Sequence, residues 1–237
     1  MKEKATKFIQ KTFTLFICLF IALVAPQLAD AHKKKTAYSN IMQAASENNI
    51  ELAKDAVSEG GTSILNPPRC PPNGICSPLV NAAERGHLEV LEYMLKEGAN
   101  PNYVNAYGNT PIIYAAMARQ KEAIKLLMQH GADVNQAKAF GVSIFKLSCI
   151  YGDEMVKTML TSHNADVNKI YSNLAVKTHN QNTTALMSFA EKCQLSSVKI
   201  LVENGADISV KDSKGLTAID YAINARKQDI VDYLVSR

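Results

Sequence analysis

One short pattern occurs four times along the chain, and this repetition constrains the fold more than any other feature of the sequence. The clearest copy is LMQHGADVN, which begins at Leu127, and a variant, LTSHNADVN, begins at Leu160. Two further relatives, YMLKEGANPN and ILVENGADIS, end at Asn102 and Ser209. A single globular enzyme core has no reason to repeat a segment, whereas an array of stacked units requires it. We therefore expect a repeat architecture.

A small hydroxyl residue opens each unit and defines the register. The five clear openings are Ser77, Thr110, Ser143, Thr184 and Thr217, and they are evenly spaced except for a longer interval between Ser143 and Thr184. A weaker unit opens at Ser39, and the interval from there to Ser77 is also longer than the regular one. The surplus residues of the two longer intervals fall between units, so we expect insertions at 61–75 and at about 170–183.

Each unit has the pattern of two short helices. The opening Ser or Thr can cap free amides, and proline follows at the first helical position in SPL and TPI. Paired alanines at 82–83 and 115–116 allow neighbouring helices to approach closely. A closing glycine, replaced once by Asn164, supplies the left-handed conformation that ends a helix. Apolar residues recur at helical spacing in the second helix, as in Val90, Leu91, Met94, Leu95, Ile230, Val231, Leu234 and Val235.

These patterns resemble the ankyrin repeat family. The family pattern D-x-x-G-x-T-P-L-H-x-A-A, followed by I-V-x-x-L-L-x-x-G-A-D-V-N, is similar to NAYGNTPIIYAA and AIKLLMQHGADVN in one unit and to DSKGLTAIDYAI and DIVDYLV in the last. The resemblance covers residues 38–237 and implies an all-α solenoid of helix-turn-helix units joined by β-turn or hairpin fingers. The expected units span about 38–60, 76–102, 103–135, 136–168, 169–209 and 210–237.

Two departures from the family pattern bear on stability. No unit keeps the histidine that follows T-P-L, so the hydrogen bonds of that side chain are absent or replaced; the residues standing there are Val80, Ile113, Lys146, Met187 and Asp220. The unit that opens at Ser143 also lacks the proline and closes with Asn164. We expect this unit to be locally less stable than its neighbours.

The segment at residues 1–31 has the layout of a secretory signal. Four lysines precede an apolar run at residues 12–25, and Ala29 and Ala31 occupy the small-residue positions of a cleavage site. A membrane anchor is the alternative, but the apolar run is shorter than the roughly 20 residues of a spanning helix. We expect cleavage after Ala31, a basic tail at 32–37, no membrane span in the mature chain, and a periplasmic or secreted location.

Charge and histidine placement exclude several classes of function. The signal holds four of the 26 basic and two of the 22 acidic residues, which leaves the mature chain at a net charge of +2 and disfavours nucleic acid as the partner. His130 and His163 lie one repeat length apart because they occupy equivalent positions of neighbouring units, and His179 lies alone in a loop. The motif search gives no catalytic residue, metal site or cofactor, so we predict a protein without enzymatic activity.

The cysteines of the mature chain fall into two kinds. Cys70 and Cys76 flank CPPNGIC, whose prolines and Asn-Gly favour a tight reversal, so they are the candidate disulfide; a metal site is the alternative, but further ligands are missing nearby. Cys149 replaces the second alanine of a pair, and Cys193 occupies the glycine position between helices. We interpret both as small packing residues rather than nucleophiles.

The resemblance places partner contacts on the turn tips and at the end of each first helix. Carried over by register, the candidate partner-binding residues are Tyr107, Asn109, Met117, Phe140, Val142, Ile150, Tyr151 and Ile170. Several are apolar where water is expected, and exposed apolar patches mark interaction sites. The alternative is that the insertion at 170–183 folds over the patch and buries it.

The function expected from these features is that of an exported, monomeric protein-binding module. By resemblance, two narrower roles remain open: a periplasmic helper in oxidative defence associated with catalase, or a secreted effector that binds host proteins. Fold alone does not name a partner.

Overall fold

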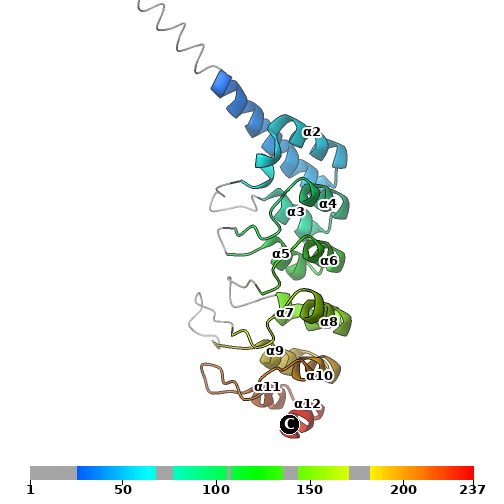
Figure 1. Ribbon diagram of the computed structural model, residues 1–237, viewed down its shortest axis with the longest axis vertical. Coiled ribbons are helices and arrows are strands. Elements are labelled where there is room, and N and C mark those ends of the chain that lie inside the picture. The colour runs from blue at the N-terminus through cyan, green and yellow to red at the C-terminus, as the bar shows by residue number, and fades with distance from the viewer. Residues whose placement is uncertain (1–25, 68–76, 106–107, 136–143, 171–181) are drawn as a thin grey trace, which may run out of the picture.

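The computed structural model describes residues 26–67, 77–105, 108–135, 144–170 and 182–237. Their helices stack into an extended column with the first described helix at one end and α12 at the other (Figure 1). The helices are α2 (Ile50–Gly60), α3 (Pro78–Arg85), α4 (Leu88–Lys96), α5 (Pro111–Met117), α6 (Lys121–Gln129), α7 (Ile144–Leu147), α8 (Asp153–Ser162), α9 (Ala185–Lys192), α10 (Leu195–Glu203), α11 (Ala218–Asn224) and α12 (Gln228–Val235). Two 3-10 helices, η1 (Thr62–Leu65) and η2 (Ser148–Tyr151), join them. The expected all-α solenoid is confirmed.

The first described helix begins before the repeat array. Residues 26–47 form one continuous helix that precedes α2, and its exposed part, 26–36, contains the expected cleavage point after Ala31 and most of the expected basic tail. Ala37 is the first buried residue of the chain's described part. Cleavage itself stays a prediction, and the apolar run at 12–25 lies outside the described residues.

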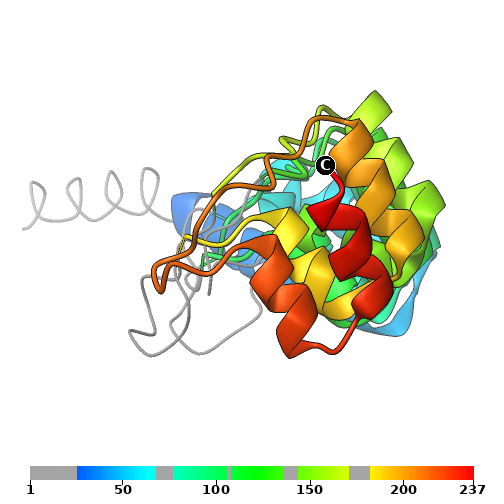
Figure 2. The ribbon, with the colours of Figure 1, turned by 90° about the horizontal axis from the view of Figure 1, so that it is seen from below.

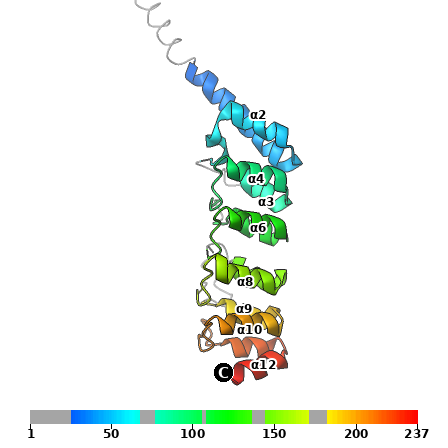
Figure 3. The same ribbon diagram turned by 45° about the vertical axis from the view of Figure 1, so that its right-hand side comes forward.

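The helices form two parallel layers. In Figures 1 and 3, the first helices of successive units stack on one another, and the second helices form a layer beside them. Viewed along the column, the turns project together from the side of the first helices (Figure 2). Amphipathic helices stacked in this way bury one continuous core, because each unit covers the apolar faces of its neighbours.

The core consists of the apolar positions that the repeat pattern places inside. The alanine pairs at 82–83 and 115–116 are buried, and so are Val90, Leu91, Met94 and Leu95 of α4. In α12, Ile230 and Leu234 are buried, but Val231 is only partly buried and Val235 is 67% exposed at the end of the column. The apolar stripe expected there is therefore narrower than its sequence indicates.

The hydrogen bonds of the missing family histidine are replaced in one unit and absent in another. In the last unit, the carboxylate of Asp220 accepts from the backbone amide and the hydroxyl of Thr217 at 2.7 and 2.8 Å. In the unit that opens at Thr110, the same position is Ile113, and the buried Thr110 hydroxyl has no hydrogen-bond partner among the described residues. Both outcomes foreseen for this position therefore occur in the same array.

A row of four asparagines, which we call the asparagine ladder, joins consecutive units along the exposed turns. Each side-chain amide donates to the closing carbonyl of the following unit at 2.8 to 2.9 Å. Each side-chain oxygen accepts a backbone amide of that same unit at 2.7 to 2.8 Å. The members of the ladder are Asn66, Asn102, Asn135 and Asn168. The repeated Asn of GADVN thus has a structural role in joining each of these units to the next.

The unit that opens at Ser143 is irregular. Its first helix, α7, has only four residues and continues as η2, whereas α5 at the same register has seven. Asn164 closes the unit with φ 48°, in the left-handed region that glycine occupies in its neighbours. The irregularity coincides with the residues where the sequence departs from the family pattern.

Candidate protein-binding surface

Two apolar side chains protrude from the ends of neighbouring first helices. Met117 is the last residue of α5 and is 66% exposed, and Ile150 lies at the same register in η2 and is 54% exposed. Both positions were predicted to contact a partner. Apolar side chains that are exposed at one register of neighbouring units form a candidate interaction surface.

A hollow of about 450 Å³ lies beside Ile150 and is lined by Arg119, Lys121, Ile150 and Tyr151. Two of its four lining residues are cationic and two carry apolar surface. We call Met117 together with these four residues the inter-helix surface. Such a combination of an apolar contact area and positive charge can hold an apolar side chain next to an acidic one.

Tyr151 is held in place by the preceding unit. Its hydroxyl donates to the backbone carbonyl of Ala116 at 2.5 Å, which ties η2 to the end of α5. Burial raises the pKa of the Tyr151 hydroxyl, and the charge of Arg119 opposes this rise. The ring is half-buried, so Tyr151 forms a fixed wall of the hollow rather than a freely exposed anchor.

Arg119 and Lys121 are parts of this surface that the sequence reasoning missed. Arg119 has φ 60°, and it stands where neighbouring units have Gly86 and Gly152. A residue other than glycine in the left-handed region costs conformational energy, and Arg226 takes φ 58° at the same register of the last unit. The repeat register contained this signal, because it places a long cation at a position that favours glycine.

The other predicted contact residues have mixed surroundings. Asn109 is only 9% exposed, and its backbone amide donates to the Asn105 side chain, so it builds the turn and offers little surface to a partner. Ile170 is exposed after the turn of the irregular unit. Tyr107, Phe140 and Val142 lie outside the described residues, and so does most of the insertion at 170–183 that was expected either to leave the patch open or to cover it.

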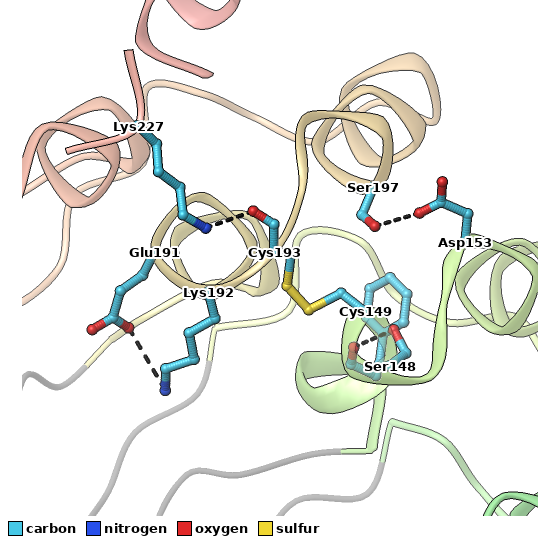
Figure 4. The surroundings of a disulfide bond; sticks show 9 residues. Ser148, Cys149, Asp153, Glu191, Lys192, Cys193, Ser197 and Lys227 are labelled. Carbon is cyan, nitrogen blue, oxygen red and sulfur yellow. Dashed lines mark hydrogen bonds and ion pairs between the residues drawn. A yellow bond between two sulfur atoms is a disulfide. The ribbon is translucent and has the colours of Figure 1, made fainter. Parts of the chain in front are cut away.

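The structure joins Cys149 to Cys193 in a disulfide, with Cα atoms 5.9 Å apart (Figure 4). Interpreting these residues only as small packing residues was therefore incomplete. They occupy the small positions expected of them, but those positions face each other across neighbouring units. The candidate pair Cys70 and Cys76 lies outside the described residues.

Polar contacts surround this disulfide on the side of the second helices. The Ser197 hydroxyl donates to the carboxylate of Asp153 (Figure 4). Hydrogen bonds from Ser197 and Ser196 lower the pKa of Asp153 below its ordinary value, because they stabilise the charged form. The Lys227 ammonium donates to the Cys193 carbonyl at 2.6 Å, and burial lowers the pKa of Lys227.

The described residues contain no group of three or more His, Cys, Asp or Glu side chains placed to hold a metal ion. His87, for example, lies 2.8 Å from the carbonyl of Ala45 through Nδ1 and so joins two units. No helix in the described ranges is long and apolar enough to cross a membrane.

Comparison with known proteins agrees with this architecture. The family profile described as ankyrin repeats (3 copies) matches residues 41–138 and 145–237. Among solved structures, the chain is similar to the immunity protein in a complex described as Bd0816 predatory endopeptidase from Bdellovibrio bacteriovorus with immunity protein Bd3460. The TM-score is 0.67 at 24% identity, and the alignment covers 84% of this chain and 97% of that chain. No curated protein gives a significant match.

Proposed function

Because the chain belongs to the ankyrin repeat family, we propose that it is an exported protein without enzymatic activity that binds a partner protein through the inter-helix surface. The observation that carries this proposal is the exposure of Met117 and Ile150 at one register of neighbouring units. Apolar side chains at the centre of a contact surface supply most of the binding free energy once a partner removes them from water.

The composition of the surface favours one class of partner segment. Arg119 and Lys121 place positive charge at the edge of the hollow, and neither has an acidic partner among the ion pairs of the described residues. We therefore expect the partner to present an apolar side chain flanked by acidic residues. Complementary charge of this kind raises the association rate and selects the partner.

Two features support export. The first is the segment at residues 1–31, which has the layout of a cleaved signal. The second is the Cys149–Cys193 disulfide, because such bonds persist in oxidising compartments and are rare in the cytosol.

The test is capture from an extract of the compartment to which the protein is exported. The bait is the full chain with a C-terminal tag, beside Met117→Asp/Ile150→Asp and the control Val235→Asp, which places one such charge on an apolar residue exposed at the far end of the column. We expect the wild type and the control to capture the same protein and the double variant to lose it. If the double variant still captures that protein, the inter-helix surface is the wrong site.

A second candidate function is protection against an endopeptidase. The solved complex that this fold resembles pairs an immunity protein with an endopeptidase, and this chain aligns with 97% of that immunity protein. Capture of an exported peptidase whose activity falls when the protein is added would favour this role. Capture of catalase or of a host protein would instead favour the oxidative-defence or effector role.

A further inference from the structure

The Cys149–Cys193 disulfide joins the unit that opens at Ser143 to the unit that opens at Thr184. At this junction the first helix is the shortest of the described array. α7 contributes four residues to this junction, and the chain between α8 and α9 includes the insertion at about 170–183. A short helix offers few side chains for burial, so the helical packing that holds the other first helices together is reduced here. The aromatic pair Phe145 and Phe189, with ring centroids 6.2 Å apart, fills the interior of the same junction.

The disulfide joins a residue next to the inter-helix surface to the end of the following first helix. Cys149 precedes Ile150 and Tyr151 in η2, and Cys193 follows the last residue of α9, Lys192. Figure 4 shows the bond passing from η2 to the end of α9. The disulfide therefore sets the position of Ile150 relative to the next unit, in a stretch where regular helix does not.

The bond lies at the edge of the core rather than inside it, because Cys149 is only partly buried while Cys193 is 7% exposed. Cys193 lines an open groove of about 580 Å³ together with Lys192 and Lys227. Positive side chains next to a cysteine favour its thiolate, the form that takes part in thiol–disulfide exchange.

We propose that Cys149–Cys193 is a redox clasp: when oxidised it holds η2 against α9, and its reduction releases η2 and loosens the adjoining inter-helix surface. In the reaction, a thiolate of a dithiol reductant attacks one sulfur of the bond, forms a mixed disulfide with that cysteine and releases the other cysteine. The second thiol of the reductant then attacks the mixed disulfide and releases the first cysteine. Two electrons and two protons pass to the protein, which gains two thiols, and the reductant becomes a cyclic disulfide. The consequence for partner binding rests on the proposed function, whereas the clasp itself does not.

The test uses the full chain, exported and purified without reductant. Free thiols are blocked before proteolysis, and mass spectrometry is used to look for a peptide pair joined through Cys149 and Cys193. Thermal unfolding is then followed by circular dichroism with and without dithiothreitol. The variants are Cys149→Ala/Cys193→Ala and the matched pair Cys70→Ser/Cys76→Ser, which removes the other two cysteines of the mature chain.

We expect dithiothreitol to lower the unfolding midpoint of Cys70→Ser/Cys76→Ser by at least about 5 °C. The reason is that the disulfide joins residues 44 positions apart and so constrains the unfolded chain. The midpoint should not respond to the reductant when Cys149→Ala/Cys193→Ala is combined with Cys70→Ser/Cys76→Ser, because no cysteine of the mature chain then remains. Hydrogen exchange of a peptide covering 144–152 should accelerate on reduction, slow again after reoxidation with oxidised glutathione, and leave 111–117 unchanged.

The clasp is overturned if the joined peptides are absent, or if reduction of Cys70→Ser/Cys76→Ser changes neither the midpoint nor the exchange of 144–152. A midpoint shift without faster exchange at 144–152 also overturns it, because the bond would then stabilise the array without controlling η2. These readouts need no partner, so they stand even if capture fails. Should Cys149→Ala/Cys193→Ala not fold, the reduced protein supplies the same comparison.

Discussion

The unit at residues 103–135, which we call the regular unit, and the unit at 136–168, the irregular unit, occupy neighbouring places in one column but are held there by different means. The regular unit has a seven-residue first helix that begins with Pro111, and a glycine, Gly131, closes it. The irregular unit has four helical residues followed by η2, and it closes with Asn164. The asparagine ladder continues through both with closely similar bond lengths.

The two units also differ in how the start of the second helix is bonded, both in which neighbouring unit it contacts and in which groups take part. In the regular unit, the side-chain amide of Gln120 donates to the Glu84 carbonyl of the preceding unit. The irregular unit has Asp153 at the same register, and its carboxylate accepts from Ser197 of the following unit. The irregular unit adds a disulfide to that same following unit. The irregular unit, whose first helix is short, thus adds specific bonds to its buried contacts with the following unit.

Replacing one core residue in each unit tests this contrast most strongly. Ile112 and Phe145 share a register and are both fully buried, but Phe145 also contacts Phe189 across the weak junction. We expect Phe145→Ala to lower the free energy of unfolding by about 3–5 kcal/mol and Ile112→Ala by about 2–4 kcal/mol, measured by urea denaturation. A smaller loss for Phe145→Ala would mean that the ring does not hold the short helix.

The ladder should contribute equally on both sides of the irregular unit. Asn102→Ala and Asn168→Ala each remove two hydrogen bonds between units, so each should cost about 1–2 kcal/mol in denaturant unfolding. The control is Asn224→Ala, an exposed asparagine outside the ladder at the end of α11. Unequal losses for Asn102 and Asn168 would show that the insertion weakens the ladder.

Exchanging the closing residues should move the two units in opposite directions. Gly131 has φ 85°, so Gly131→Ala places a side chain in a disfavoured conformation and should cost about 1 kcal/mol. Asn164→Gly relieves a milder version of the same strain and should stabilise the protein by less than about 1 kcal/mol. Thermal unfolding of both variants gives the signs, and loss of stability in Asn164→Gly would indicate that the asparagine side chain has a role of its own.

The smallest expected effect is a dependence of stability on pH that arises from Asp153 in the irregular unit. Hydrogen bonds lower the pKa of Asp153 in the folded protein, so its contribution is present above the pKa of an unfolded aspartate, about 3.9, and is lost as the pH falls through the folded value. Asp153→Asn should remove this component, worth less than about 1 kcal/mol at neutral pH for a partly exposed group. The measurement is the difference in unfolding free energy between variant and wild type from pH 6 to pH 3.

The same pH range offers a control. Gln120→Glu puts a carboxylate at the matching position of the regular unit, where the neighbouring carbonyl of Glu84 cannot donate to it. This variant should lose stability at neutral pH and recover it on acidification. The Asp153 carboxylate of the wild type does the reverse, because it adds stability at neutral pH and loses that contribution on acidification. A gain of stability at neutral pH in Gln120→Glu would refute the contrast, because a carboxylate at this register would then be as favourable in the regular unit as in the irregular one.

The repeat register in the sequence predicted the features that depend on local pattern. The capped starts at Ser77 and Thr184 and the buried alanine pairs follow from residue type and spacing, and the structure shows them. The exposure of Met117 and Ile150 could be predicted for the same reason, because the register places both at the end of a first helix.

The rest depends on contacts between units, which spacing within one unit does not reveal. Cys149 and Cys193 are 44 residues apart, and their pairing arises only when η2 and the end of α9 are stacked. Arg119 could have been recognised from the register, but its place beside Tyr151 is created by the neighbouring unit. The burial of Asn109 likewise comes from the fold of its turn around Asn105.

The asparagine ladder has a consequence for how such a chain can change its length. Asn102 reaches a carbonyl 29 positions ahead and Asn168 one 37 positions ahead, yet both bonds are 2.9 Å long. The extra chain between the later pair of units therefore leaves the bridge itself unaltered. The pitch of the column is set by side-chain length rather than by the count of residues between bridges. Fingers of different lengths can be inserted at the turns while the rest of the column keeps its alignment.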